Sequence, residues 1–126
     1  MTEECVLRIK TSVDLTETEI VRSGKLVQNV NGMSVSYREE NAEVKIILSP
    51  QKAEVVRNGD YGLKLCLEEK KNTSGILEIG GNEGKVDVYT HEVFFGTSQG
   101  LTLIRLHYDL YFGKEKQEMK LCILIR

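Results

Sequence analysis

The residues best suited to chemistry near neutral pH are two histidines, His91 and His107, because imidazole can both transfer protons and bind metals. They fall on neighbouring predicted strands, where their rings could meet with Tyr89 and Arg105 alongside. A carboxylate such as Asp109 would complete a metal-binding set. However, the strand registers derived below turn this face outward into solvent. The sequence therefore favours two surface histidines, and we expect no metal here.

A second group of polar residues is predicted on the inner face of a sheet. Arg57 lies near the end of its strand, where its guanidinium could hold the carboxylate or phosphate of a ligand whose tail contacts aliphatic walls. The residues of this predicted ligand-binding cluster are Arg57, Tyr37, Thr90, Tyr108 and Arg22. In the competing interpretation, internal hydrogen bonds satisfy the hydroxyl groups and Arg57 reaches solvent. Barrels of this size are often filled by side chains, which favours that interpretation.

Nothing else in the sequence forms a recognisable catalytic set. Cys5, Cys66 and Cys122 are an odd number of widely spaced cysteines within apolar strand patterns, which is typical of reduced thiols that pack as small hydrophobic residues. The glycine-rich segment 80–84 has no P-loop lysine and no helix after it, so it predicts a hairpin turn and not a phosphate site. We therefore expect no catalytic residue, no cofactor and no enzymatic activity.

Length and composition indicate one ordinary globular domain over residues 1–126. The chain is 40% hydrophobic and 29% charged, which excludes general disorder. Its net charge is −2, with no strongly basic half, so nucleic-acid binding through phosphate contacts is not expected. No apolar stretch is long enough to span a membrane, and the N-terminus does not resemble a signal peptide. We expect a cytoplasmic protein.

Short runs of alternating apolar and polar residues, separated by Gly, Asn and charged clusters, predict β-strands along the whole chain. Gly24 interrupts a long strand and predicts a bulge or a sharp bend, as at a barrel corner. Asn31 and Gly32 predict a hairpin turn, because both residues tolerate positive φ. The first strands are expected at residues 5–13, 18–30, 33–39 and 44–48.

The clearest register follows from a two-residue turn at Gly113 and Lys114. That turn places Tyr108 opposite Met119, and it gives the hairpin one almost wholly apolar face. The residues of the other, outward face are Arg105, His107, Asp109, Glu118 and Lys120. A slip of one residue would bury charged side chains and is therefore disfavoured.

A second register depends on a three-residue loop, 58–60, which would place Arg57 opposite Tyr61 and Val55 opposite Leu63. Glu54 would then face Lys64 on the solvated side of the sheet.

The turn before the strand that holds His107 allows two alternatives. A five-residue loop, 96–100, would place Thr90 and Phe94 inside, together with Val86 and Val88, and Glu92 near the open end. A four-residue loop would place Tyr89, His91 and Val93 inside, and Glu92 would pair with Arg105 outside. We prefer the first alternative because it buries Asp87 less.

Strands joined by short turns predict an all-β fold, a single antiparallel up-and-down meander of about eight to ten strands that closes into a barrel. A β-sandwich is the alternative. Short motifs over nearly the whole chain resemble the YwiB-like family of small bacterial β-barrel proteins. The residues that carry this resemblance are 55–59, 63–67, 87–92 and 106–110. The resemblance implies a calycin-like barrel, related to lipocalins, and no established activity.

The leading functional hypothesis is a non-enzymatic module that binds a small, partly apolar or amphipathic ligand in the barrel, with an anionic end near Arg57. The alternative is a protein–protein interaction module that acts through the outer sheet face or an open edge. Its predicted partner contacts are Arg38, Arg105, His107 and Asp109. We expect neither nucleic-acid nor membrane partners, and either a monomer or a homodimer.

Overall fold

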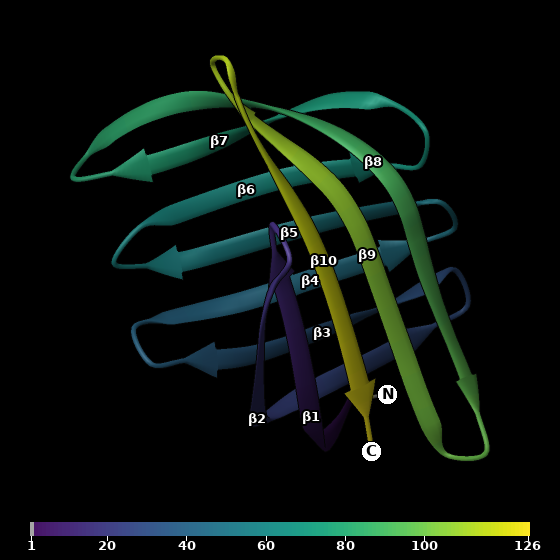
Figure 1. Cartoon of the computed structure of the whole chain (residues 1–126). Coiled ribbons are helices and arrows are strands. Elements are labelled where there is room, and N and C mark those ends of the chain that lie inside the picture. Colours follow the sequence, from purple (N-terminus) through teal and green to yellow (C-terminus); the bar gives the residue numbers. More distant parts are fainter. Residues whose placement is uncertain (1) are drawn as a thin grey trace.

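The computed structural model describes residues 2–126, which form ten antiparallel β-strands in a closed barrel (Figure 1). Each strand pairs with the next one along the chain, and the first pairs with the last. The predicted all-β meander is thus confirmed. Within the described residues, no helix is long and apolar enough to cross a membrane. The strands are β1 (Thr2–Val13), β2 (Thr16–Asn29), β3 (Gly32–Glu39), β4 (Ala42–Ser49), β5 (Lys52–Gly59), β6 (Gly62–Glu68), β7 (Asn72–Ile79), β8 (Asn82–Ser98), β9 (Leu101–Phe112) and β10 (Glu115–Ile125).

The barrel has two walls whose strands cross steeply, and two long strands connect them (Figure 1). Strands β3 to β7 form the distant wall, whereas β9, β10 and β1 form the near one. Strand β2 pairs with β1 from Thr16 to Val27, but with β3 only from Gly24 onward. Strand β8 pairs with β7 up to Tyr89 and continues along β9 to Ser98. These two strands therefore carry the bends that close the barrel.

The inner faces of the strands meet in one continuous apolar cluster. Nine of its leucine and isoleucine side chains are almost completely buried, and burial of each such side chain is worth about 1.5–3 kcal/mol. They are Leu7, Ile9, Ile46, Leu65, Leu67, Ile104, Leu106, Ile123 and Ile125. Side chains from both walls thus fill the barrel, as is usual for closed sheets of this size.

Two of the predicted turns are confirmed and one is displaced. Gly113 and Lys114 connect β9 to β10, and Tyr108 faces Met119 as predicted. Residues 80–81 form a two-residue turn in which both glycines have positive φ. The β2–β3 turn lies at residues 30–31, one position before the predicted one. Gly32 is the first residue of β3, where an added Cβ would collide with the Leu48 carbonyl oxygen.

The predicted β5–β6 register is wrong by two residues. Arg57 pairs with Leu63 and Val55 with Leu65, so the loop is wider than expected. The Arg57 guanidinium explains this, because it bridges the loop by donating to the Tyr61 carbonyl oxygen at 2.8 Å and pairing with Asp60 at 2.8 Å. A slip of two residues leaves every side chain on the predicted face.

Gly24 gives a direct test of the corner in β2. A Cβ added there would stand 2.5 Å from the Ser36 carbonyl oxygen and 2.7 Å from Leu7 Cδ1, so the backbone would have to move. We expect Gly24→Ala to lower the free energy of unfolding by about 2 kcal/mol, as overpacking typically does. Urea denaturation of the purified protein measures this change.

The matched control is Gly84→Ala, because an added Cβ at Gly84 meets nothing within 4 Å. If the two variants had equal stabilities, the β2 corner would not depend on close backbone approach at Gly24.

Candidate functional site

A β-bulge in β8 determines which of its residues lie on the outer surface of the barrel. Thr90 pairs with Tyr108, but Glu92 pairs with His107, so His91 is the extra residue between them. Before the bulge, Thr90 faces the core, as predicted with the five-residue loop. After the bulge, Glu92 lies outside and pairs with Arg105, as predicted with the four-residue loop.

Both predicted β8–β9 loops are wrong, since the turn is formed by residues 99–100. The preferred loop placed Phe94 and Glu92 inside, yet Phe94 is 40% exposed and lies under the Arg105 guanidinium. Val93 takes the inner position and is buried. The physical reason is the bulge, which places two successive side chains on the same face and reverses the alternation beyond it.

Glu69 holds the bulge from the neighbouring segment. One oxygen of its carboxylate, Oε2, accepts a hydrogen bond from the Val93 backbone N–H at 2.9 Å. The backbone of Thr90 is also tied to the loop after β6, because its carbonyl oxygen accepts from the Lys70 N–H at 2.8 Å and its own N–H donates to the Lys71 carbonyl oxygen. Backbone groups freed by the irregular pairing are thereby satisfied.

Three side chains on the outer face of β8 and β9 lie close together and form the His91–His107–Asp109 cluster. The two imidazole rings are stacked, with centroids 4.4 Å apart. Nε2 of His91 lies 2.8 Å from Oδ2 of Asp109, and Nε2 of His107 lies 3.0 Å from Oε2 of Glu118. Tyr89 contacts the edge of the His91 ring at 5.0 Å between centroids.

The prediction that this whole outer face is solvated is wrong for Asp109, which is only 2% exposed. His91 covers it from β8, and the Lys116 ammonium lies 3.7 Å from its Oδ2. The other carboxylate oxygen, Oδ1, is buried without a hydrogen-bond partner among the described residues.

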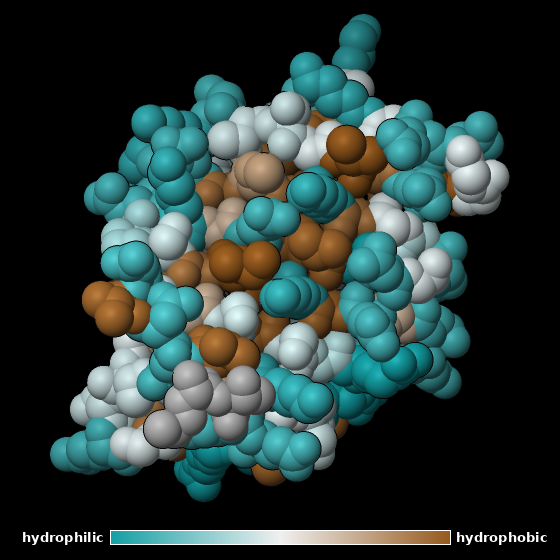
Figure 2. Space-filling view, turned by 180° about the vertical axis from the view of Figure 1, so that it is seen from behind, coloured by the Kyte–Doolittle hydropathy of each residue, from teal (hydrophilic) through white to brown (hydrophobic). Residues whose placement is uncertain are grey.

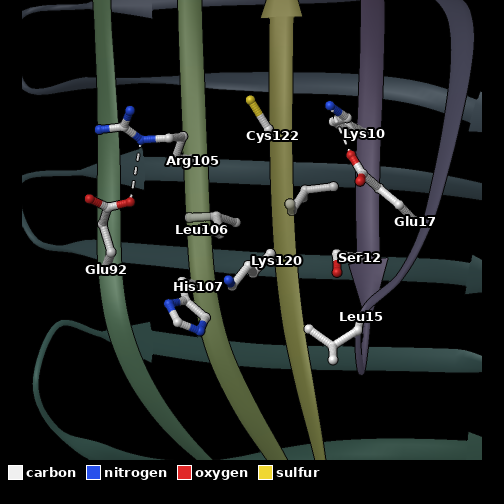
Figure 3. A pocket seen from close by; sticks show the side chains of 11 residues that line it. Lys10, Ser12, Leu15, Glu17, Glu92, Arg105, Leu106, His107, Lys120 and Cys122 are labelled. Atoms are coloured by element: carbon white, nitrogen blue, oxygen red, sulfur yellow. Dashed lines mark ion pairs between the residues drawn. The ribbon is translucent and has the colours of Figure 1, made fainter.

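A broad groove of about 750 Å³ runs beside this cluster across β8, β9, β10 and β1 (Figure 3). Two ion pairs flank it, Arg105–Glu92 at 3.3 Å and Lys10–Glu17 at 2.8 Å. Lys120 lies between them and forms no ion pair with any residue of the described chain 2–126. The lining residues are Lys10, Ser12, Leu15, Glu17, Glu92, Arg105, Leu106, His107, Lys120, Leu121 and Cys122.

Three residues of the predicted ligand-binding cluster are buried inside the barrel: Tyr37, Thr90 and Tyr108. Burial, and then the charge of Tyr61, raises the pKa of the Tyr108 phenol to about 12. Burial, followed by the charge of Glu39, also raises the pKa of Tyr37. Both phenols therefore stay neutral at physiological pH, and they stand among apolar neighbours.

The two arginines of that cluster are already engaged. Arg57 is only 13% exposed and pairs with Asp60 at 2.8 Å and with Glu39 at 3.5 Å. Burial alone would lower the pKa of its guanidinium, but the hydrogen bond to Asp60 and the charges around it raise that pKa overall. Arg22 lies opposite Leu7 on β1 and donates to the Val21 carbonyl oxygen at 3.0 Å.

The three cysteines are all free thiols. Burial is the main cause that raises the pKa of the Cys5 thiol. The expectation that every cysteine is packed is wrong for Cys66, which is exposed because its side chain lies on the outer face of β6. Cys122 is partly buried and lines the groove.

Comparison with known proteins assigns the chain to a family. Residues 6–123 match the family model described as "Domain of unknown function (DUF1934)". The chain belongs to the DUF1934 family. It is also similar to the ywiB protein from Bacillus subtilis, whose crystal structure superposes with a TM-score of 0.85 at 16% sequence identity. The superposition covers 99% of this chain and 92% of that one.

The predicted resemblance to YwiB-like proteins is thus confirmed for this DUF1934 protein. At such low identity, the likeness to the ywiB protein shows the shared fold alone. No curated protein matches the chain. Any function must therefore be argued from the residues of the site itself.

Thr90 tests whether the inner polar residues hold a ligand. Its Oγ1 is buried and has no hydrogen-bond partner in the described chain. A buried hydroxyl without a partner costs free energy, so Thr90→Val should raise the free energy of unfolding by about 1 kcal/mol. Thermal and urea denaturation measure the change.

The matched control is Thr102→Val, because the Thr102 hydroxyl is buried but hydrogen-bonded to Thr97 Oγ1 at 2.9 Å. This variant should lose stability. Destabilisation by Thr90→Val of similar size would mean that the Thr90 hydroxyl has a partner inside the barrel.

Proposed function

We propose that this DUF1934 protein is a non-enzymatic binding module that takes a small, partly apolar anion in the groove across β8, β9, β10 and β1. The class of ligand is the one expected from the sequence, but the binding surface is outside the barrel. The observation that carries the proposal is the position of Lys120. Its ammonium has no carboxylate partner in residues 2–126, although the other two basic groups of the groove, Arg105 and Lys10, have one each.

The surroundings of Lys120 suit an anion with an apolar part. His107 and Ser12 are its direct neighbours on the adjacent strands β9 and β1. Leu15, at the tip of the β1–β2 turn, is 86% exposed and stands over one end of the groove (Figure 3). A charge-assisted hydrogen bond to Lys120 and apolar contact with Leu15 would hold the two parts of such a ligand.

The inside of the barrel offers less support for binding. The inner faces are filled by a continuous apolar cluster, so a ligand there would have to displace side chains. Arg57 was expected to hold the anionic end, but two carboxylates already neutralise it. An anion at the mouth of the barrel would compete with both.

A protein-interaction module is the second candidate, and one observation favours it. Figure 2 shows hydrophobic side chains gathered over the outer face of the far wall, within a hydrophilic surround. Ile47 of β4 and Ile76 of β7 point outward and are 40% and 47% exposed. Of the expected partner contacts, however, Arg38 is paired with Glu43 at 2.6 Å and Asp109 is buried.

The fluorescent dye anilinonaphthalene sulfonate, an apolar anion, is a suitable probe of the groove. We expect it to bind the native protein and Lys120→Met to weaken binding about fivefold to tenfold, the usual effect of losing one charged hydrogen bond at a partly exposed site. Lys114→Met is the matched control. It removes the same charge at the β9–β10 turn, six positions away along the chain, and should leave the affinity unchanged.

The cysteines locate the dye independently. Bound dye should slow the alkylation of Cys122, which lines the groove, and leave that of the exposed Cys66 unchanged. Equal affinities of the native protein and Lys120→Met, or protection of neither thiol, would contradict the proposal.

A further inference from the structure

We propose that His91, His107 and Asp109 form a binding site for one divalent transition-metal ion of the Zn²⁺ class. The site lies on the outer face of β8 and β9, and it does not depend on ligand binding in the neighbouring groove.

The donor atoms are already close together. One nitrogen of each imidazole and one carboxylate oxygen of Asp109 all lie within 4.8 Å of one another. In a tetrahedral zinc site with bonds of about 2.1 Å, donor atoms stand about 3.4 Å apart, so only small side-chain rotations are needed. Two imidazoles and a carboxylate form a ligand set that suits zinc and similar borderline ions.

The carboxylate of Asp109 gives independent support. It is a buried side chain, 3% exposed, in which Oδ2 faces His91 at 2.8 Å while Oδ1 has no hydrogen-bond partner in the described chain. A buried anionic oxygen without a partner is costly, and proteins usually satisfy such an atom. A bound cation would supply a partner for this carboxylate.

The groups around the cluster are those expected around metal ligands. Nε2 of His107 lies 3.0 Å from Glu118 Oε2, and a ligating histidine usually donates its second nitrogen to a carboxylate in this way. That contact would leave Nδ1 of His107 for the ion. The Lys116 ammonium lies 3.7 Å from Asp109 Oδ2 and would compete with a bound ion, but its side chain is 56% exposed and can move into solvent.

The bulge lies at the site itself. His91 is the extra residue between the pairs Thr90–Tyr108 and Glu92–His107, and its ring stacks on that of His107 with centroids 4.4 Å apart. The carboxylate of Glu69 fixes that geometry by accepting from the Val93 N–H at 2.9 Å. The backbone on both sides of His91 is therefore held in place, in addition to the contacts of its own side chain.

Calorimetric titration of the full-length, metal-free protein with Zn²⁺ tests the proposal. We expect one ion per chain with a dissociation constant in the micromolar range or below. His91→Ala and Asp109→Asn should each weaken binding at least tenfold. Asp87→Asn is the matched control, since Asp87 is an exposed carboxylate on β8, the strand of His91. The Asp87→Asn variant should bind zinc like the native protein.

Thiols are the other zinc-binding groups of the surface, so the titration is repeated with Cys66→Ser and Cys122→Ser combined, which should leave the affinity unchanged. Circular dichroism confirms that each variant is folded; His91 is 34% exposed, so its replacement should be tolerated even if that of Asp109 is not.

Lys120→Met should keep the zinc affinity, and His91→Ala should keep dye binding in the groove, which separates the two proposals. No saturable binding, or binding lost with the cysteines and retained in His91→Ala, would overturn the metal site.

Discussion

A ten-stranded antiparallel sheet can close on itself only where some strands bend sharply, and in this protein two strands carry that constraint. Strand β2 bends at Gly24, where the backbones of β2 and β3 approach too closely for a side chain. Strand β8 bends at the bulge around His91. Glycines and bulges are the two devices by which curved sheets are built, because each relieves the crowding that a regular strand would suffer at a corner.

The second corner links the fold to the surface chemistry. The extra residue in β8 reverses the alternation of side chains, so the first half of the strand points Thr90 inward and the second half points Val93 inward. The same reversal adds Glu92 to the outer face next to His91, and there Glu92 pairs with Arg105. A device that barrel closure requires thereby places one of the two ion pairs that flank the groove.

The interior of the barrel stabilises the fold, whereas its exterior carries the groups that could bind a ligand or a metal ion. Inside, polar residues such as Tyr37 and Tyr108 are surrounded by apolar side chains, and their burial keeps the phenols neutral. Outside, the wall formed by β8, β9, β10 and β1 carries a groove with Lys120, which has no ion-pair partner in residues 2–126, and the His91–His107–Asp109 cluster next to it. Both features lie on the outer face, which is why we place binding there.

Periodicity and turn chemistry were enough to predict the meander, the barrel and the β9–β10 register, because a slip of one residue there would bury Arg105 and His107. They could not detect the slip of two residues between β5 and β6, since a slip of two preserves both faces. The bulge was also missed. In the first half of β8 the even-numbered residues point inward, whereas in the second half Val93 does, and one regular strand cannot satisfy both patterns. The burial of Asp109 was missed as well, because it depends on the side chains of His91 and Lys116 that lie against it.

The central claim is that His91, His107 and Asp109 form a metal-binding cluster on the outside of a filled barrel. A crystal structure of the protein grown with zinc, with anomalous diffraction measured at the zinc edge, tests it most directly. The account predicts one strong anomalous peak bounded by His91, His107 and Asp109, and only side-chain density between Tyr37 and Tyr108. Zinc bound elsewhere on the protein, or a ligand inside the barrel, would contradict it.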